Sequence, residues 1–402
     1  MKGILQKCRV LILLSAFPCF LFAAEPNAVY LTWQSDPHTT MTINWITKTN
    51  DNNDALQYRP SATAAWIPVN GNHNVLPVDK SYQVHRVSLN GLKPGATYEF
   101  SLKTDNNQIY TFKTMSETFD KPVRFVLGGD TYGDDNRDEN FAAMNTRAAS
   151  YDPLCAFLGG DLSYAGNLKS EFKYWIKWFN IWWKTMRGPN ARLIPIVPAI
   201  GNHEVEGGEG QPVNKLVYYN FFPTTNPKDK TYYALKFGKE MLMVMLDADN
   251  VSDITGSQSK WLNAVLAENQ SRPHLFALYH QGAYPSVRSF NRSKAKEIRK
   301  SWGTLFEKYG LDIAFEHHDH AYKRTYPLYQ GEVSHSKGVV YVGDGAWGVA
   351  PRKVQNGHRP EFVKTDSTRH FMLMEIQGRS RKIFAIKSDG TIVDQWEMIA
   401  KR

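Results

Sequence analysis

The stretch 160–164 places a carboxylate, Asp161, and a phenol, Tyr164, three residues apart, just after a short apolar run at 154–158. Such a run predicts a buried strand that ends in a turn, and open α/β sheets bind their ligands at this end of the strands. A carboxylate can bridge two metal ions. A phenol has an ordinary pKa of about 10 and becomes a ligand only when a strongly Lewis-acidic ion such as Fe(III) removes its proton. The pair therefore indicates a metal centre with one hard trivalent ion.

Four more predicted strands end in residues of related chemistry. Taken singly, an Asp after a strand caps a turn, an Asn occupies a left-handed turn, and a lone His is usually structural. Turn chemistry gives no reason for histidines at two of these loops. Carboxylate, amide, imidazole and phenolate together form a set that holds two adjacent ions of different hardness. The candidate residues are Asp130, Asp161, Tyr164, Asn202, His203, His280, His317, His318 and His320.

Strands, loops and helices alternate from residue 122 to residue 400, which predicts an α/β domain with central sheets flanked by helices. Within it, Trp175, Trp178 and Trp182 follow helical spacing. We expect this aromatic helix to pack in the core, with a platform beside the site as the alternative. Strands are expected at 123–127, 154–158, 193–200, 240–246, 275–279 and 311–315, and helices at 258–267 and 293–309.

Residues 25–117 have an all-β pattern that predicts a small antiparallel sandwich. Short alternating runs separated by turn residues, such as 41–47 and 81–89, carry this pattern. The domain shows no cluster of ligating residues along its sequence, and its histidines, His38, His73 and His85, are expected to be solvated or structural. Residues 116–121 are the expected linker. The length of 402 residues also favours two domains.

The first 24 residues have the layout of a secretory signal peptide. Three basic residues precede an apolar run at 10–22 and the small residues Ala23 and Ala24, after either of which cleavage is expected. The run is too short to span a membrane comfortably, so no stable membrane span remains after cleavage. Cys19 is compatible with a lipoprotein cysteine, although Pro18 makes a poor lipobox. We therefore expect a secreted or periplasmic protein.

The composition narrows the remaining function classes. A hydrophobic content of 42% and an aromatic content of 13% exclude a disordered chain. The formal net charge of +9 either steers anionic substrates or reflects a generally basic surface. No dense run of Lys or Arg is present, so we expect no nucleic-acid partner. Cys155 is the only cysteine outside the signal segment, which excludes a disulfide framework.

The chain from about residue 122 to residue 398 resembles the purple acid phosphatases, within the calcineurin-like metallophosphoesterases. That family carries a fibronectin type III-like domain at its N-terminus, and residues 89–98 resemble the hallmark of such domains. The matching motifs in the second domain are Gly129-Asp130, Gly160-Asp161-Leu162-Ser163-Tyr164, Gly201-Asn202-His203-Glu204, the lone His280 and His318-Asp319-His320-Ala321-Tyr322-Lys323-Arg324.

The resemblance implies a binuclear centre in which Asp161 bridges an Fe(III) ion and a divalent ion of Fe, Zn or Mn. It also implies that His203 stays off the metals and assists the leaving group. The ligands implied for Fe(III) are Asp130, Tyr164 and His320, and those for the divalent ion are Asn202, His280 and His318.

An exported phosphatase that hydrolyses small phosphate monoesters is the function that this resemblance implies, with attack by a metal-bridging hydroxide. Two ions can lower the pKa of a bridging water toward neutrality, and a protonated His203 would give the leaving oxygen its proton. A phosphodiesterase with the same centre is the first alternative. A binding or adhesion module with a catalytically dead second domain is the other, although the complete set of ligands argues against it.

Three departures from the family pattern carry their own expectations. Tyr132 and His317 stand where the family usually has glycine. Tyr132 either packs or competes with Tyr164 as the phenolate, and His317 adds a third imidazole to the last motif. We expect Tyr164, His318 and His320 to be the ligands. Plant-type members place histidines after the fourth motif, where this chain offers Arg288 and Arg292. Either one arginine holds the substrate phosphate, which would move the pH optimum toward neutrality, or both are surface charges.

Overall fold

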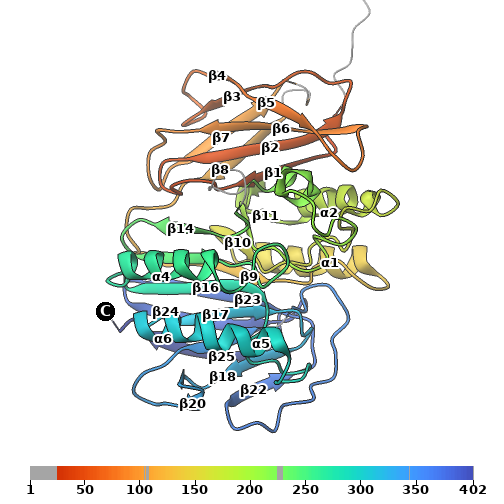
Figure 1. Cartoon of the computed structure of the whole chain (residues 1–402). Helices are drawn as coiled ribbons and strands as arrows, with labels where there is room; N and C mark the ends of the chain where they lie inside the picture. Colours follow the sequence, from red (N-terminus) through yellow and green to blue (C-terminus); the bar gives the residue numbers. More distant parts are fainter. Residues whose placement is uncertain (1–24, 104, 106–107, 224–229, 344, 402) are drawn as a thin grey trace, which may run out of the picture.

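Two large mixed β-sheets stacked face to face organise the chain (Figure 1). The computed structural model describes residues 25–103, 105, 108–223, 230–343 and 345–401. The predicted signal segment lies outside these residues. The described part agrees with the predicted fold class, because an all-β region is followed by an α/β region whose sheets are flanked by helices.

The first large sheet has ten strands and runs through both predicted domains. Strand β1 of the N-terminal region pairs in parallel with β13 of the α/β region, with Thr32 opposite Ile196. One sheet of the predicted sandwich is therefore continuous with a sheet of the second region. In spatial order the strands are β25 (Ile392–Ile399), β24 (Ser380–Ile386), β23 (Phe371–Gln377), β9 (Val123–Gly128), β10 (Cys155–Leu158), β13 (Ile196–Pro198), β1 (Ala28–Thr32), β2 (Met41–Lys48), β6 (Tyr82–Leu89) and β5 (Asn72–Val75).

The remaining strands form a seven-stranded sheet, the second sheet of the sandwich and two short ribbons. The seven-stranded sheet contains β14 (Tyr233–Phe237), β15 (Met241–Met245), β16 (His274–Gln281), β17 (Ile313–His317), β21 (Val340–Gly343), β18 (Tyr322–Thr325) and β22 (Phe362–Asp366). The sandwich sheet contains β4 (Ile67–Asn70), β3 (Ala55–Arg59), β7 (Thr97–Leu102) and β8 (Ile109–Lys113). The ribbons pair β11 (Arg187–Gly188) with β12 (Arg192–Leu193) and β19 (Leu328–Tyr329) with β20 (Glu332–Val333).

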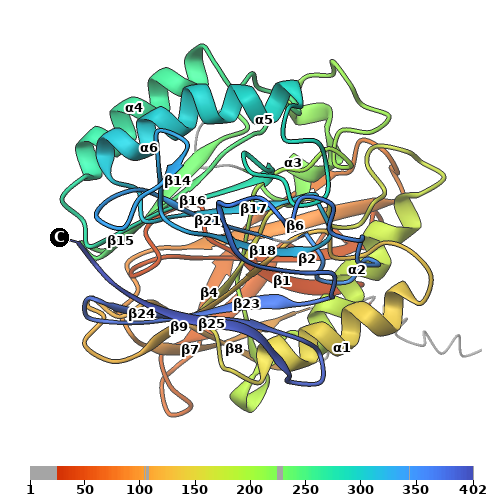
Figure 2. The same ribbon diagram turned by 90° about the horizontal axis from the view of Figure 1, so that it is seen from below.

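Helices cover the outer faces of the two large sheets (Figure 2). Helices α1 (Arg137–Ala149) and α2 (Phe172–Thr185) pack on the ten-stranded sheet. The seven-stranded sheet is covered by α4 (Ser257–Asn269), α5 (Ser293–Ile298) and α6 (Thr304–Tyr309), with a π-helical turn at Arg299–Gly303 between the last two. Short helical segments occur at Pro189–Ala191, Val213–Lys215 and Val217–Phe221. Among the described residues, no helix combines the length and the hydrophobicity that a membrane crossing requires.

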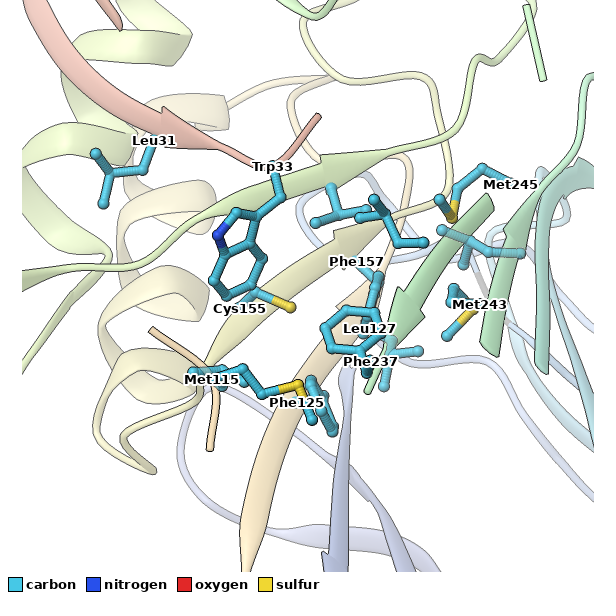
Figure 3. Packing of buried hydrophobic residues seen from close by; sticks show 14 of the residues in the cluster. Leu31, Trp33, Met115, Phe125, Leu127, Cys155, Phe157, Phe237, Met243 and Met245 are labelled. Atoms are coloured by element: carbon cyan, nitrogen blue, oxygen red, sulfur yellow. The ribbon is translucent and has the colours of Figure 1, made fainter. Parts of the chain in front are cut away.

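Continuous apolar strands produce this layering, because alternate side chains point to opposite faces of a sheet. In β9, Phe125 and Leu127 enter the core between the two sheets, whereas Val126 packs outward under the helices. Strand β15 does the same with Met243 inside and Val244 outside. Figure 3 shows the inner core, where Phe125, Leu127 and Met243 gather with the buried side chain of Cys155.

The aromatic helix α2 belongs to the core. Trp175, Trp178 and Trp182 are buried and pack with Phe141 of α1 and Phe179 of α2 against the ten-stranded sheet. The packing role predicted from their helical spacing is therefore the observed one, and these rings do not form a platform at the site.

Candidate metal centre

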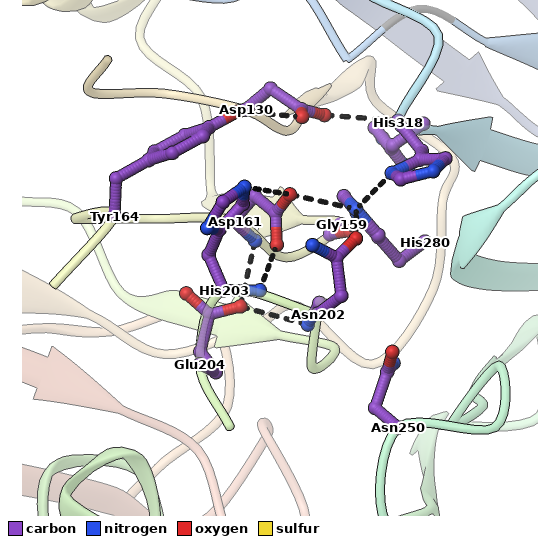
Figure 4. A network of polar contacts seen from close by, with 12 residues as sticks. Asp130, Gly159, Asp161, Tyr164, Asn202, His203, Glu204, Asn250, His280 and His318 are labelled. Atoms are coloured by element: carbon purple, nitrogen blue, oxygen red, sulfur yellow. Dashed lines mark hydrogen bonds and ion pairs between the residues drawn. The ribbon is translucent and has the colours of Figure 1, made fainter. Parts of the chain in front are cut away.

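The carboxyl ends of strands from both large sheets meet at one point (Figure 4). Strands β9, β10 and β13 are parallel neighbours in the first sheet, and β16 and β17 are parallel neighbours in the second. Since the side chains after parallel strands lie at one edge of a sheet, stacking two such edges brings five loops together. All of the predicted ligand residues come from these loops or from the end of β16 itself.

The backbone is strained where it delivers these side chains. Asp130, Asp161, Tyr164, His318 and His320 all have positive φ, between 51° and 75°. Such values cost energy for residues with a Cβ, and they cluster at functional sites where the surrounding fold enforces them. A regular strand would place successive side chains on alternate faces of the sheet. The tight turns instead direct the side chains of these residues toward the site.

One half of the site contains Asp130, Tyr164 and His320. The Tyr164 hydroxyl donates to Asp130 Oδ1 at 2.9 Å and lies 3.2 Å from His320 Nε2. His320 Nε2 is 2.8 Å from the same Asp130 oxygen. A phenol oxygen, a carboxylate oxygen and an imidazole nitrogen thus converge on one small volume.

The other half contains Asp161, Asn202, His280 and His318. His280 Nε2 lies 3.0 Å from Asp161 Oδ2, 3.2 Å from Asn202 Oδ1 and 3.1 Å from His318 Nδ1. The ligand atoms of Asp161, His280 and His318 all lie within 4.8 Å of one another, as a shared ion requires. His280 Nδ1 pairs with the Gly159 carbonyl at 2.9 Å, which orients Nε2 toward the site.

Two further candidates from the sequence point elsewhere. Tyr132 is buried, and its hydroxyl donates to Asp138 on α1. His317 Nδ1 pairs with the Tyr279 carbonyl at 2.9 Å, and its ring packs directly against Gly159. A Cβ on Gly159 would lie only 2.0 Å from His317 Nδ1, so this close approach requires glycine.

The electrostatics of the metal-free protein favour a cation at this place. Burial alone would lower the pKa of His280, but the carboxylates of Asp161 and Asp130 raise it to about 9. Burial and the neighbouring His280 charge hold the pKa of His318 far below its ordinary value. Burial, followed by the Asp130 charge, raises the pKa of Tyr164 well above 10. A proton on His280 therefore takes the place of a positive ion, and the phenol needs a cation nearby to ionise.

His203 lies at the rim of the site with about one third of its side chain exposed. Its Nε2 is 3.9 Å from Asp161 Oδ2, and its Nδ1 pairs with Glu206 at 2.9 Å. The ring packs against Tyr164, with 4.3 Å between ring centroids. The imidazole is thus fixed beside the centre, with one nitrogen facing it.

Two carboxylates that support the site were not singled out from the sequence. Glu204 is buried and accepts hydrogen bonds from the backbone amides of Asp161, Leu162 and Gly201, which ties two ligand loops together. Burial and the Asp161 charge raise the pKa of Glu204 to about 7. Glu206 holds His203, as described above. The spacing of Glu204 within its motif was visible in the sequence, but its three amide partners are defined only by the fold.

The two arginines after the fourth motif differ in their surroundings. Arg288 Nη1 donates to the His318 carbonyl and lies 3.2 Å from Asp319 Oδ1. Arg292 reaches the outer side of the site, where its Nη1 lies 3.5 Å from His318 Nε2. Both line a small hollow together with Lys294 and Gly282.

The donor set fits two metal ions. Every predicted ligand side chain contributes an oxygen or a nitrogen to one of the two halves. Within the second half, Asp161 is the residue that lies next to His203. Oxygen donors and a phenol suit a hard ion, and imidazoles with an amide suit a divalent transition metal. Such an arrangement is suited to metal-dependent hydrolysis of phosphate esters.

Comparisons with known proteins agree with this chemistry. Residues 123–322 match the calcineurin-like phosphoesterases, and residues 26–119 match the N-terminal domain of purple acid phosphatases. The chain belongs to the purple acid phosphatase family, which is a family of metal-dependent phosphatases. The fold class predicted from the sequence is confirmed by the same matches.

Individual relatives are distant. An uncharacterized protein of Mycobacterium tuberculosis, Rv2577, is 25% identical over 343 residues, which are 76% of this chain and 63% of the relative. The probable purple acid phosphatase 20 of Arabidopsis thaliana is 26% identical over 326 residues, covering 76% of this chain and 71% of the relative. Purple acid phosphatase PPD1 from yellow lupin seeds shares the fold, with a TM-score of 0.78 at 18% identity over 93% of this chain and 74% of that structure.

Proposed function

We propose that this chain is an exported phosphatase that hydrolyses small phosphate monoesters at a centre of Fe(III) and a divalent ion of Fe, Zn or Mn. The observation that carries the proposal is the convergence of seven candidate ligand side chains from five strand ends on one place. Export rests on the signal-like segment of the sequence. The pairing of metals rests on the donor types, a phenol in one half and two imidazoles with an amide in the other.

The proposed ligands divide between two positions that share Asp161. The Fe(III) position takes the phenol with the first Asp and the last His, because these three donor atoms already contact one another. The divalent position takes the side chains that surround His280 Nε2. In full, the proposed ligands are Asp130, Tyr164 and His320 for Fe(III), Asn202, His280 and His318 for the divalent ion, and Asp161 for both.

Two such ions, when bound, polarise a phosphate oxygen and lower the pKa of a bridging water toward neutrality. The chain itself contributes position and charge. Asp161 is held in place by the backbone amide of His203, which donates to its Oδ1 at 2.8 Å. Burial alone would raise the pKa of Asp161, but the His280 imidazole outweighs it and keeps the carboxylate ionised.

His203 is the proposed acid for the leaving group. Glu206 accepts from Nδ1 at 2.9 Å and so fixes the orientation of the ring, which leaves Nε2 to donate toward the centre. An ester oxygen that leaves on this side would take the proton from Nε2, so that the P–O bond breaks without releasing a free alkoxide. Such general acid catalysis is typically worth about 10²–10⁴-fold in rate.

Arg292 is the proposed contact to the substrate phosphate. Its guanidinium faces the divalent position and makes no carboxylate ion pair among the described residues, whereas Arg288 already binds Asp319 and the last ligand loop. A guanidinium holds two phosphate oxygens side by side and remains charged at any working pH. We therefore expect a pH optimum nearer neutrality than a histidine at this place would give.

Turnover of two chromogenic substrates by the purified mature chain tests the proposal. We expect p-nitrophenyl phosphate to be hydrolysed much faster than bis(p-nitrophenyl) phosphate, together with two metals per chain and a visible absorption band. The Asp161→Asn variant serves as the inactive control. A preference for the diester would make the enzyme a phosphodiesterase. Absence of turnover with both metals bound would favour a binding module and overturn the proposal.

A further inference from the structure

A second cluster of ligand side chains lies in the N-terminal sandwich, far along the chain from the candidate metal centre. Its members are Asp54, His73 and His85, whose ligand atoms lie within 4.8 Å of one another. The three residues are widely spaced in sequence, and the sequence pattern alone gave the histidines only a solvated or structural role. The strands bring them together, because His73 of β5 and His85 of β6 are directly opposite cross-strand neighbours.

Both imidazoles turn the same nitrogen to one carboxylate. His85 Nδ1 lies 2.7 Å from Asp54 Oδ1, and His73 Nδ1 lies 3.0 Å and 2.9 Å from the two Asp54 oxygens. The His85 side chain is fully buried, and those of His73 and Asp54 are 30% and 22% exposed. Two nitrogens and one carboxylate therefore converge at the edge of the sheet, with access from solvent on one side.

The His85 ring is fixed in the orientation of a metal ligand. Its Nε2 lies 2.7 Å from the Thr47 hydroxyl, and its plane stacks on Trp45 at 4.9 Å between ring centroids and 5° between planes. A partner on the far nitrogen of a ligating imidazole orients the ring and defines which nitrogen faces the ion. The strand pairing holds the two rings together, because Trp45 of β2 is directly opposite His85 of β6.

The loop that supplies Asp54 carries a second carboxylate, Asp51, whose Oδ1 accepts from the Asn53 amide. Asp51 Oδ2 is buried and has no hydrogen-bond partner among the described residues. Its charge acts on the His85 imidazole, and Gln83 Nε2 links the two by donating to the Asp51 carbonyl while lying 3.1 Å from His85 Nε2. The charges of two carboxylates, Asp54 and Asp51, therefore act on the buried His85 imidazole, which favours a positive ion there.

We propose that Asp54, His73 and His85 bind a divalent transition-metal ion, with Zn²⁺ as the best-suited ion. Imidazole and carboxylate at this ratio suit Zn²⁺ and its neighbours better than Ca²⁺ or Mg²⁺, which prefer oxygen ligands alone. Three protein ligands leave one tetrahedral position for water. The ion would join the loop before β3 to the β5–β6 pair, and so would connect the two sheets of the sandwich independently of the phosphatase centre.

Zinc binding by the full mature chain and three variants tests this proposal. His73→Ala removes the most exposed ligand, Asp54→Asn keeps the shape of the carboxylate, and His335→Ala removes an exposed histidine outside the cluster as a matched control. After dialysis against Zn²⁺ and then against metal-free buffer, we expect wild type and His335→Ala to hold one more zinc per chain than the two cluster variants. Added Zn²⁺ should also raise the melting temperature of wild type and control only. Phosphatase activity should be equal in all four proteins.

Equal zinc content and equal zinc-induced melting shifts in wild type and His73→Ala would overturn the proposal, and the cluster would then be a hydrogen-bonded trio only. Should His73→Ala fail to fold, His73→Gln retains a polar side chain of similar reach without the imidazole and replaces it in the comparison. A lower zinc content that is accompanied by loss of activity would also overturn the proposal, because the metal lost would then belong to the phosphatase centre.

Discussion

The Tyr164 hydroxyl donates a 2.9 Å hydrogen bond to Asp130 Oδ1, a contact between residues 34 positions apart. The competing phenol, Tyr132, follows Asp130 by two residues but donates instead to Asp138 on α1. Tyr132 is therefore the closer tyrosine to Asp130 in the sequence, but the fold brings Tyr164 to the site. This difference gives the most direct test of the centre.

Replacing Tyr164 by Phe should abolish the colour of the iron-loaded protein, because a phenolate bound to Fe(III) gives the charge-transfer band. Tyr132→Phe serves as the matched control and should leave the band unchanged. Visible spectra of both variants at equal iron content provide the measurement. A spectrum that is bleached in Tyr132→Phe and intact in Tyr164→Phe would reassign the ligand.

Changes at Asp161 and His203 should separate metal binding from proton transfer. Asp161→Asn should empty at least one metal position, since the carboxylate is the proposed bridge. His203→Asn should keep both metals and lower kcat by about 10²–10⁴-fold for poor leaving groups. The decrease in kcat should be smaller for esters of acidic phenols, because the phenolate that leaves needs little protonation. A decrease independent of the leaving group would show that His203 is not the acid.

The two arginines should respond differently to truncation. Arg292→Ala should raise KM for the phosphate ester several-fold with the metal spectrum unchanged, because its guanidinium is free to meet the substrate. Arg288→Ala should disturb the loop of His318 through its lost contacts with the His318 carbonyl and Asp319, and so alter the spectrum. Wild-type kinetics in Arg292→Ala would make that residue an ordinary surface charge.

An ion pair between the two large sheets should make part of the stability depend on pH. Asp394 of β25 accepts from Arg324 Nε at 2.7 Å and from the Tyr322 hydroxyl at 2.7 Å. Burial alone would raise the pKa of Asp394, but these hydrogen bonds hold it below its ordinary value. The unfolded state thus binds the proton more readily, so this stabilisation is complete above about pH 4 and is lost as pH falls through the lower folded-state pKa.

Asp394→Asn should therefore lower the free energy of unfolding by roughly 1–2 kcal/mol at pH 7. The difference in free energy of unfolding between the variant and wild type should become smaller as the pH falls below about 4, where wild-type Asp394 also becomes neutral. Urea unfolding at a series of pH values measures both. Glu332→Gln, at an exposed carboxylate on β20, is the control and should change little at any pH. A difference that stays constant with pH would exclude the charge as its cause.

The fold class and the identity of most candidate ligands could be predicted from the sequence because they depend on local pattern. Buried parallel strands appear as apolar runs, and each run here ends in a side chain that can bind a metal. Long, regular elements such as β16 and α4 were predicted close to their observed bounds. Strand β5 and helix α1 were not predicted, because β5 is mostly polar and exposed and α1 contains few large apolar residues.

Contacts between distant parts of the chain decided the rest. The choice of Tyr164 over Tyr132 follows from a positive φ at Tyr164 and from packing of Tyr132 under α1, neither of which leaves a local signal. His317 points away from the ligands because Gly129 and Gly159 leave space for its ring. The cluster of Asp54, His73 and His85 depends on the register of β5 against β6. Register and close packing are set by the whole sheet at once, so they become determined only when its strands pair.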